Sequence, residues 1–283
     1  MKEAYFNNDF EYYFSNEFGK MIHHNFPNIL KNCALVILKP ECLLTNRINV
    51  ALRILKEYNF EPIYFKIKIL SQQQVFSLWK YGWNEASLAR ILMNCIVMDF
   101  SPCVIIVFKN NLDSLKDPCE FLNSHKGKSC ISKSDHVSIR YRLGAVNNFL
   151  NFIHISDSFD DMVRELALLY TYNEIIALFE ALKNNITISM NCIQEEAMPY
   201  INNYVFSDPI TLFKEYIISL SNKSINRNIM EELHKAFEKK SISNELFISL
   251  ISNNLIDWDW HSIILFSSFI ETIDEHKTTL YRD

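Results

Sequence analysis

The feature that most constrains the fold is the alternation of short apolar segments with amphipathic segments over residues 32–171. Four apolar segments have the length and composition of strands, at 33–39, 60–70, 102–108 and 149–155. Amphipathic helices are expected between them, with an extra helix pair after the second strand. This βαββαβ order is typical of a ferredoxin-like antiparallel sheet covered by helices. We therefore predict an α+β fold for this part of the chain.

The extra helix pair has two candidate caps. Ser71 predicts the start of a helix that runs through Trp79, and Asn84 predicts the start of a second helix that ends near Cys95. The final helix of this region is expected over 156–170, directly after the last strand.

The strand signals stop after about Tyr172, and helical patterns follow to the end. Asp208-Pro209 is a helix-start signal, because aspartate caps a helix and proline suits its first turn. Residues 1–31 are rich in aromatic side chains and predict a helical leader. We expect three parts: the leader at 1–31, the α+β domain at 32–171, and an all-helical domain at 172–283.

The composition excludes several classes of protein. The chain has 283 residues, 49% of them hydrophobic, and a formal net charge of -5, which argues against a nucleic-acid partner. No apolar run approaches the ~20 residues that a membrane helix needs, so no membrane association is expected. The acidic, aromatic start does not resemble a signal peptide, which predicts a cytoplasmic protein.

Cysteine and glycine usage narrows the chemistry further. The seven cysteines include no C-x-x-C pair, so neither a zinc site nor a disulfide framework is predicted. With only four glycines, the chain has too few glycine positions to favour a Gly-rich phosphate loop. A phosphate site in this protein must use side chains.

His154 and Glu165 form the candidate reactive pair. The histidine lies at the end of the last apolar segment, and the carboxylate follows eleven residues later inside the next predicted helix. A neutral imidazole is a good nucleophile when a carboxylate fixes the proton on its other nitrogen. Taken alone, such a histidine is more often a buried structural residue beside a solvated helix.

Three motifs favour a functional role for His154 over a structural one, because together they resemble the nucleoside diphosphate kinase family. Residues 34–41, ALVILKPE, resemble the family's first strand ending in I-K-P-D, and residues 138–144, SIRYRLG, resemble its [ST]-[IL]-R-x-x-[FY]-G segment. Residues 151–158, NFIHISDS, resemble N-x-x-H-G-S-D-S. The helix that follows matches the family's E-[IL]-A-L at residues 165–168. The resemblance covers residues 32 to 171.

The resemblance implies a role for each matching residue. It implies that His154 is phosphorylated by a nucleoside triphosphate, with Mg²⁺ carried by the nucleotide phosphates, and that Glu165 orients its ring. It further implies phosphate contacts for Lys39 and Arg140, which neutralise charge on the transferring oxygens. Asn151 is implied to line the nucleotide site. The remaining implied site residues are Ser156, which supports the histidine, and Tyr81, which stands in the segment that replaces the family's nucleotide clamp.

The sequence also departs from the family pattern. Ile155 stands where a glycine follows the histidine, and its side chain either crowds the imidazole or shifts the backbone. The R-P-F-F-x-x-L-V-x-Y-M clamp is replaced by residues 81–90, YGWNEASLAR. The stretch with the family's phosphate-binding arginine and threonine is missing, with Lys116, Lys126 and Lys128 as candidate substitutes.

Three functions remain open on the sequence. The preferred one is a phosphotransferase that works through a phosphohistidine at His154, with an acceptor that differs from a standard nucleoside diphosphate. The alternative is a catalytically inactive nucleotide-binding or protein-interaction module on the same fold. In a third, His154 serves as a general base. The expected partners are a nucleotide, a second small-molecule or protein acceptor, and a further copy of the chain in a homo-oligomer.

Overall fold

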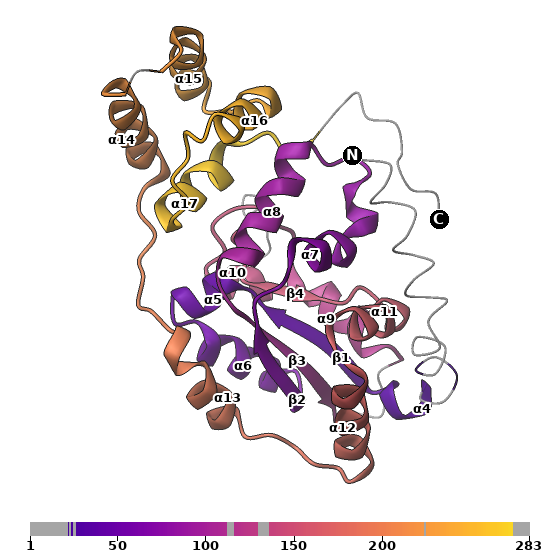
Figure 1. The fold of residues 1–283 in the computed structure, drawn as a ribbon. Helices are drawn as coiled ribbons and strands as arrows, with labels where there is room; N and C mark the ends of the chain where they lie inside the picture. Colours follow the sequence, from indigo (N-terminus) through magenta and orange to yellow (C-terminus); the bar gives the residue numbers. More distant parts are fainter. Residues whose placement is uncertain are drawn as a thin grey trace.

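We describe the fold from a computed structural model of the chain. The structure describes residues 22, 24, 27–111, 116–129, 136–223 and 225–273. Most of the predicted helical leader therefore lies outside the described residues. The α+β fold predicted for the first part of the chain and its helical continuation are both confirmed (Figure 1).

A four-stranded antiparallel sheet forms the centre of the first part. Its strands are β1 (Cys33–Leu38), β2 (Phe60–Lys68), β3 (Cys103–Asn110) and β4 (Ile153–Ile155), in the spatial order β2-β3-β1-β4. The central strand β1 is buried along its whole length, as its unbroken apolar sequence requires. β4 pairs with β1 at the edge of the sheet, and His154 lies opposite Ile37.

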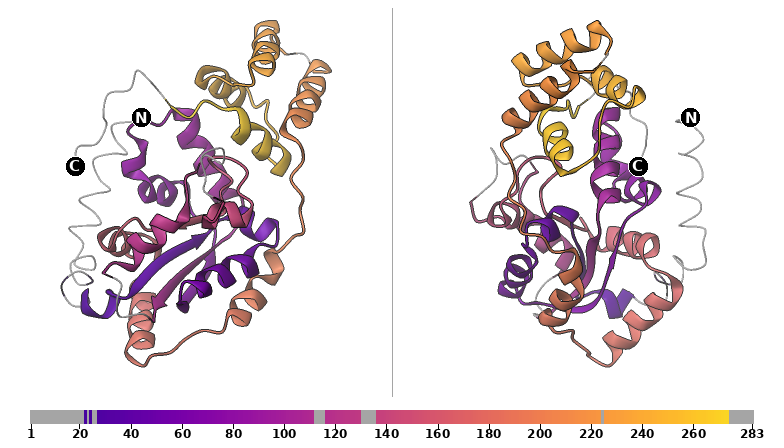
Figure 2. Two further views of the ribbon diagram at one scale, coloured as in Figure 1. Left: turned by 180° about the vertical axis from the view of Figure 1, so that it is seen from behind. Right: turned by 60° about the vertical axis from the view of Figure 1, so that its left-hand side comes forward.

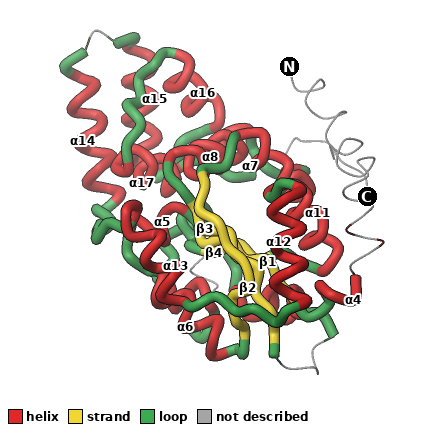
Figure 3. Tube along the Cα trace, turned by 60° about the horizontal axis from the view of Figure 1, so that its bottom comes forward, coloured by secondary structure: helices red, strands yellow, loops and turns green. Residues whose placement is uncertain are grey.

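Helices lie on both sides of the sheet. In Figure 3, α11 and α12 lie on one side of the strands, and α5, α6 and α13 lie on the other. The helices of this region are α4 (Pro27–Leu30), α5 (Pro40–Leu44), α6 (Ile48–Glu57), α7 (Gln72–Leu78), the 3-10 turn η1 (Lys80–Trp83), α8 (Leu88–Phe100), α9 (Pro118–Lys126), α10 (Ile139–Leu143), α11 (Phe159–Leu169), α12 (Tyr172–Lys183), α13 (Met190–Ala197) and the 3-10 turn η3 (Met198–Tyr200).

The predicted helix pair forms, but one of its caps is wrong. Ser71 caps α7 as predicted, and Gln74 completes a capping box with it. The second helix, α8, is capped by Ser87 rather than Asn84, and it extends to Phe100. The reason is the 3-10 turn η1, which occupies the chain up to Trp83 and delays the start of α8.

The last strand is also shorter than predicted. Residues 149–152 are not part of β4, because the Asn147 side chain accepts hydrogen bonds from the Phe149 and Leu150 amides and Phe152 has a left-handed backbone with φ of 70°. Only three residues around His154 remain as β4. The following helix, α11, begins at Phe159 after the Ser158 cap rather than at Ser156.

Four further helices form what we call the C-terminal helical unit. They are α14 (Pro209–Ser221), α15 (Arg227–Lys239), α16 (Asn244–Ser252) and α17 (Trp260–Phe269). An extended segment leads to this unit along the outside of the molecule (Figure 2). Asp208 caps α14 and Pro209 occupies its first turn, as the sequence predicts.

The described residues form two large hydrophobic cores and a small third cluster of Trp83, Ala86 and Ile91. The first contains the sheet and its helices, including buried residues of α12 and α13. The second contains the C-terminal helical unit together with part of α8 and the loop before β4. α12 and α13 follow residue 171 in the sequence, yet they contact β2 and α6 of the α+β region. Of the described helices, none has the length and apolar character needed to cross a membrane.

Candidate active site

His154 is presented by β4 with both ring nitrogens engaged. Its Nε2 lies 3.0 and 3.1 Å from the two carboxylate oxygens of Glu165 on α11. Its Nδ1 accepts a hydrogen bond from the indole Nε1 of Trp79 at 3.2 Å. The imidazole is buried, and the two rings meet edge to face.

Glu165 is held as a carboxylate. Burial opposes its ionisation, but the adjacent His154 ring, the nearby Arg164 guanidinium and the Ser156 hydroxyl outweigh burial and lower the pKa of Glu165. Ser156 donates its hydroxyl to the Oε2 of Glu165. Ser156 therefore supports the carboxylate and reaches the histidine through it, which is how the predicted role of Ser156 can be exerted.

These contacts assign the tautomer of His154. An ionised carboxylate accepts hydrogen bonds only, so Nε2 carries the proton, and the indole N–H donates only, so Nδ1 presents its lone pair. Both neighbours therefore require the same neutral tautomer. Nδ1 is the ring nitrogen that carries the lone pair, and Trp79 is the residue next to it.

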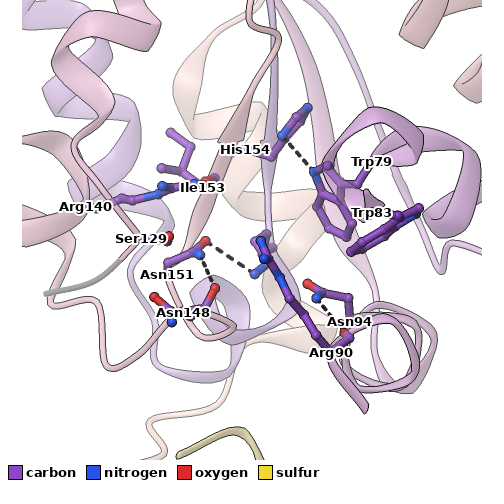
Figure 4. A pocket seen from close by; sticks show the side chains of 12 residues that line it. Trp79, Trp83, Arg90, Asn94, Ser129, Arg140, Asn148, Asn151, Ile153 and His154 are labelled. Carbon is purple, nitrogen blue, oxygen red and sulfur yellow. Dashed lines mark hydrogen bonds between the residues drawn. The ribbon is translucent and has the colours of Figure 1, made fainter. Parts of the chain in front are cut away.

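A cavity of about 160 Å³ opens beside His154 (Figure 4). Its walls come from the ends of β1 and β4, from α8 and α10, and from the loop before β4. In the part of the chain that the structure describes, three cations line it, Lys39, Arg90 and Arg140, and no carboxylate does. The other polar lining side chains are those of Asn94, Asn148, Asn151 and Ser129.

Lys39 forms the floor of the cavity at the end of β1. Its ammonium group donates to the Phe149 carbonyl and to Asn151 Oδ1, at 3.3 Å from the latter, and pairs with Glu41 at 3.4 Å. Burial and, to a lesser extent, the nearby Arg140 lower the pKa of Lys39, while Glu41 opposes that shift. This buried lysine is thus positioned by three partners before any ligand arrives.

Arg140 projects from α10, which Ser138 caps. Its two terminal nitrogens donate to the carbonyls of Gly127 and Ile153 at 3.1 and 3.2 Å. Burial lowers the pKa of Arg140 to about 10, so the guanidinium stays charged at neutral pH. Its Nε is buried without a hydrogen-bond partner among the described residues.

Phe152 stores backbone strain two residues before His154. A φ of 70° is costly for an aromatic residue, on the order of 1–3 kcal/mol. Two contacts stabilise it: its amide donates to Glu41 Oε1, and its carbonyl accepts from the Lys39 amide. The Lys39–Glu41 pair therefore also fixes the backbone that leads into β4.

The structure brings most of the predicted site residues together. His154, Lys39, Arg140 and Asn151 line the cavity, and Glu165 and Ser156 lie behind the imidazole. Tyr81 lies outside the cavity lining, where its ring is 5.5 Å from the Arg164 guanidinium carbon.

The structure also shows whether Ile155 crowds the imidazole and whether a lysine replaces the missing phosphate-binding residues. Ile155 is fully buried in the first core and is not a cavity residue, so its side chain does not crowd the imidazole. Lys126 binds the Ile155 carbonyl and Asp157 instead of the cavity, and neither Lys116 nor Lys128 lines it.

Several cavity residues were missed by the sequence reasoning, and Trp79, Arg90 and Asn94 are the ones that bear most on its chemistry. Trp79 follows α7, and Arg90 and Asn94 lie one turn apart on α8. Figure 4 shows Arg90 extending from α8 toward the centre of the cavity. The i, i+4 spacing of Arg90 and Asn94 on a largely apolar helix was a signal that could have identified this polar face.

The described residues include no cluster of three histidine, cysteine, aspartate or glutamate side chains that could hold a metal ion. The described residues that line the cavity offer amide oxygens and no carboxylate. They therefore fit Mg²⁺ as an ion carried by substrate phosphates, which is a common mode of binding for this cation.

Comparison with known proteins agrees with this geometry. The family model described as "Nucleoside diphosphate kinase" matches residues 32–175, about half of the chain. Two proteins named nucleoside diphosphate kinase, from Histophilus somni strains 2336 and 129Pt, are 27% identical over 143 residues, which cover 50% of this chain and 95% of theirs.

Solved structures of similar chains come from other organisms. An Aquifex aeolicus nucleoside diphosphate kinase is 20% identical with a TM-score of 0.42, and the match covers 50% of this chain and 97% of that one. A nucleoside diphosphate kinase family protein from Babesia bovis is 17% identical, also with a TM-score of 0.42, over 50% of this chain and 90% of its own.

The sheet, the histidine on its edge strand and the family match together define a kinase-like, nucleotide-binding class of protein. The chain belongs to the nucleoside diphosphate kinase family, as a divergent member with an additional C-terminal helical unit.

Proposed function

We propose that this protein is a phosphotransferase that works through a phosphohistidine at His154. The observation that carries the proposal is the pairing of His154 with Glu165 through Nε2, which leaves the Nδ1 lone pair on the other side of the ring, next to Trp79 in the wall of a cation-lined cavity. Lys39, Arg90 and Arg140 supply the positive charge that a triphosphate requires.

The proposed reaction has two balanced steps. The Nδ1 lone pair forms a bond to the γ-phosphorus, the bond from that phosphorus to the bridging oxygen breaks, and the nucleoside diphosphate leaves with the electron pair. The ring then carries a positive charge, which Glu165 stabilises through Nε2–H. In the second step, an oxygen of the acceptor attacks the phosphorus and returns the electron pair to Nδ1.

Mg²⁺ would enter with the triphosphate and neutralise charge on its oxygens. The acceptor is proposed to differ from a standard nucleoside diphosphate, because the segment that replaces the family's clamp ends at Arg90, and Arg90 stands in the cavity wall with Asn94 one turn further along α8. The cytoplasmic location and the homo-oligomer stay predictions from the sequence.

One observation favours a second function, a nucleotide-binding module without turnover. The Trp79 indole occupies the Nδ1 lone pair, so that hydrogen bond must break before Nδ1 can attack phosphorus. If Trp79 does not move, the same cavity binds phosphates without transfer. A general-base role for His154 would need the same lone pair.

The test is labelling with γ-³²P ATP or GTP in the presence of Mg²⁺. We expect an acid-labile, alkali-stable phosphoprotein that is lost in His154→Ala and kept in His261→Ala, a change at a half-exposed histidine of α17. No label on folded protein with any divalent metal would refute the phosphohistidine. Activity retained in His154→Gln would instead favour a role other than covalent catalysis.

A further inference from the structure

Helix α8 belongs to the cavity and to the C-terminal helical unit at the same time. Ala89, Met93 and Val97, spaced by four residues, are buried in the second core with α14 to α17. Arg90 and Asn94, on the neighbouring face, line the cavity. The position of the two polar side chains therefore depends on how α8 packs against the C-terminal helices.

The start of α8 is also fixed by residues from the C-terminal part of the chain. The Ser87 hydroxyl donates to the Glu271 carbonyl at 2.6 Å, and the Ser87 amide donates to the Thr272 carbonyl. The Ala89 amide donates to Asn244 Oδ1 at 2.8 Å. Since the first amides of a helix need partners from outside the helix, α16 and the segment after α17 complete this terminus.

A second connection runs through Asn147, in the loop before β4. Asn147 Oδ1 accepts hydrogen bonds from the Phe149 and Leu150 amides, both at 2.9 Å. Its Nδ2 donates to the hydroxyls of Ser267 and Ser268 on α17, at 3.0 and 3.2 Å. A single side chain thus shapes the loop and attaches it to the C-terminal helical unit.

The same loop supplies groups to the cavity. The Phe149 carbonyl accepts from Lys39, and Asn151 contacts Lys39 and lines the cavity beside Asn148. Phe149 and Leu150 are buried in the second core rather than the first. A shift of α17 would therefore move the partners of the cavity lysine.

We propose that the C-terminal helical unit is a positioning element of the phosphate cavity, and that Asn147 is the positioning residue through which α17 sets the loop around Lys39. The unit acts on two walls at once, through α8 and through this loop. The consequence for catalysis rests on the proposed phosphotransfer at His154.

The test removes the attachment without touching the cavity. Ser267→Ala/Ser268→Ala deletes both acceptors of Asn147 Nδ2 and keeps a good helix former in α17. The matched control is Ser219→Ala/Ser221→Ala on α14, where both hydroxyls are exposed and bond to carbonyls of their own helix.

Two measurements on the full chain are made for each variant. One is hydrogen exchange of the Phe149 and Leu150 amides, which reports on the loop without requiring activity. The other is the rate of His154 labelling by γ-³²P ATP. For Ser267→Ala/Ser268→Ala we expect exchange to rise about fivefold, as for the loss of a hydrogen bond, and labelling to fall about tenfold through misplacement of cavity groups. The control should match the wild-type protein.

Asn147→Asp serves as a second variant, because aspartate keeps the oxygen that caps the loop and loses the N–H donor. Native exchange and native labelling in both variants would overturn the proposal, as would faster exchange with unchanged labelling. If the wild-type protein takes no label, the phosphohistidine fails, and titration of each variant with Mg-ATP replaces labelling. Weaker binding in Ser267→Ala/Ser268→Ala than in its control then supports the positioning role, and equal binding refutes it.

Discussion

Replacing Glu165 with glutamine tests whether the carboxylate stabilises the charge that the proposed phosphorylation would place on His154. The two groups lie 3.0 Å apart in a buried site. At an effective dielectric constant of about 20, unit charges at this distance attract by about 5.5 kcal/mol. Glutamine keeps a neutral hydrogen bond, and charge develops only in part at the transition state, so about half of this attraction should be lost.

A loss of about 2.7 kcal/mol corresponds to roughly a hundredfold slower phosphorylation. The assay is the time course of His154 labelling from γ-³²P ATP at saturating nucleotide. The matched control is Glu174→Gln, a carboxylate on the next helix whose capping box tolerates glutamine and whose ion-pair partner is Lys66.

We expect the control to label at the wild-type rate. Labelling of Glu165→Gln within threefold of wild type, in a protein of native stability, would refute the reasoning. It would show that the carboxylate acts on neither the tautomer nor the charge of the ring.

Three further predictions concern stability. The lowered pKa of Glu165 adds stability that is present above pH 4.5, the ordinary pKa of glutamate, and that is lost as the pH falls below this value. The unfolding free energies of wild type and Glu165→Gln, measured in urea at a series of pH values, should therefore become more similar toward pH 3. Lys39→Met leaves Glu41 buried without its cation and should lower the free energy of unfolding in urea by about 3–5 kcal/mol. Adding Glu41→Gln should recover part of this loss. Gly127→Ala would press a Cβ against the Ser138 side chain at a φ of +85°, so we expect a loss of about 1–3 kcal/mol, seen as a lower Tm, whereas an unchanged Tm would contradict the close approach.

Much of the fold follows from local sequence patterns. β1 and β3 are unbroken apolar segments of strand length, and α6 and α7 carry clear periodicity or a capping box. These signals are local, so they can be read from a single chain. The placement of α12 and α13 against β2 and α6 is tertiary, and amphipathic helices alone do not specify which core they join.

The site residues also divide into those that local motifs predict and those that only the tertiary structure reveals. His154, Glu165, Lys39 and Arg140 belong to contiguous motifs and could be predicted together. Trp79 could not be predicted, because a tryptophan at a helix end is ordinarily a packing residue. Its hydrogen bond to His154 depends on the tertiary packing that brings β4 next to it.

Ile155 is a residue for which the sequence suggested an effect on the site that the structure does not show. Its replacement of a glycine suggested an obstruction, yet neighbouring strand residues point to opposite faces of a sheet. A side chain next to His154 in sequence therefore belongs to the core rather than to the cavity.

The size and charge of the cavity bear on what the protein recognises. A volume of about 160 Å³ is below the ~300 Å³ at which pockets begin to enclose a drug-sized ligand, so it suits phosphate groups better than a whole nucleotide. The Lys39 ammonium and the two terminal nitrogens of Arg140 already have protein partners, which orients both side chains before binding and reduces the entropy that a ligand must remove. Arg90 and Asn94 lie on the wall that the C-terminal helical unit supports. On the proposed mechanism, affinity should then come chiefly from the phosphates, and changes in α8 or in the helices behind it should alter which acceptor reaches Nδ1 of His154.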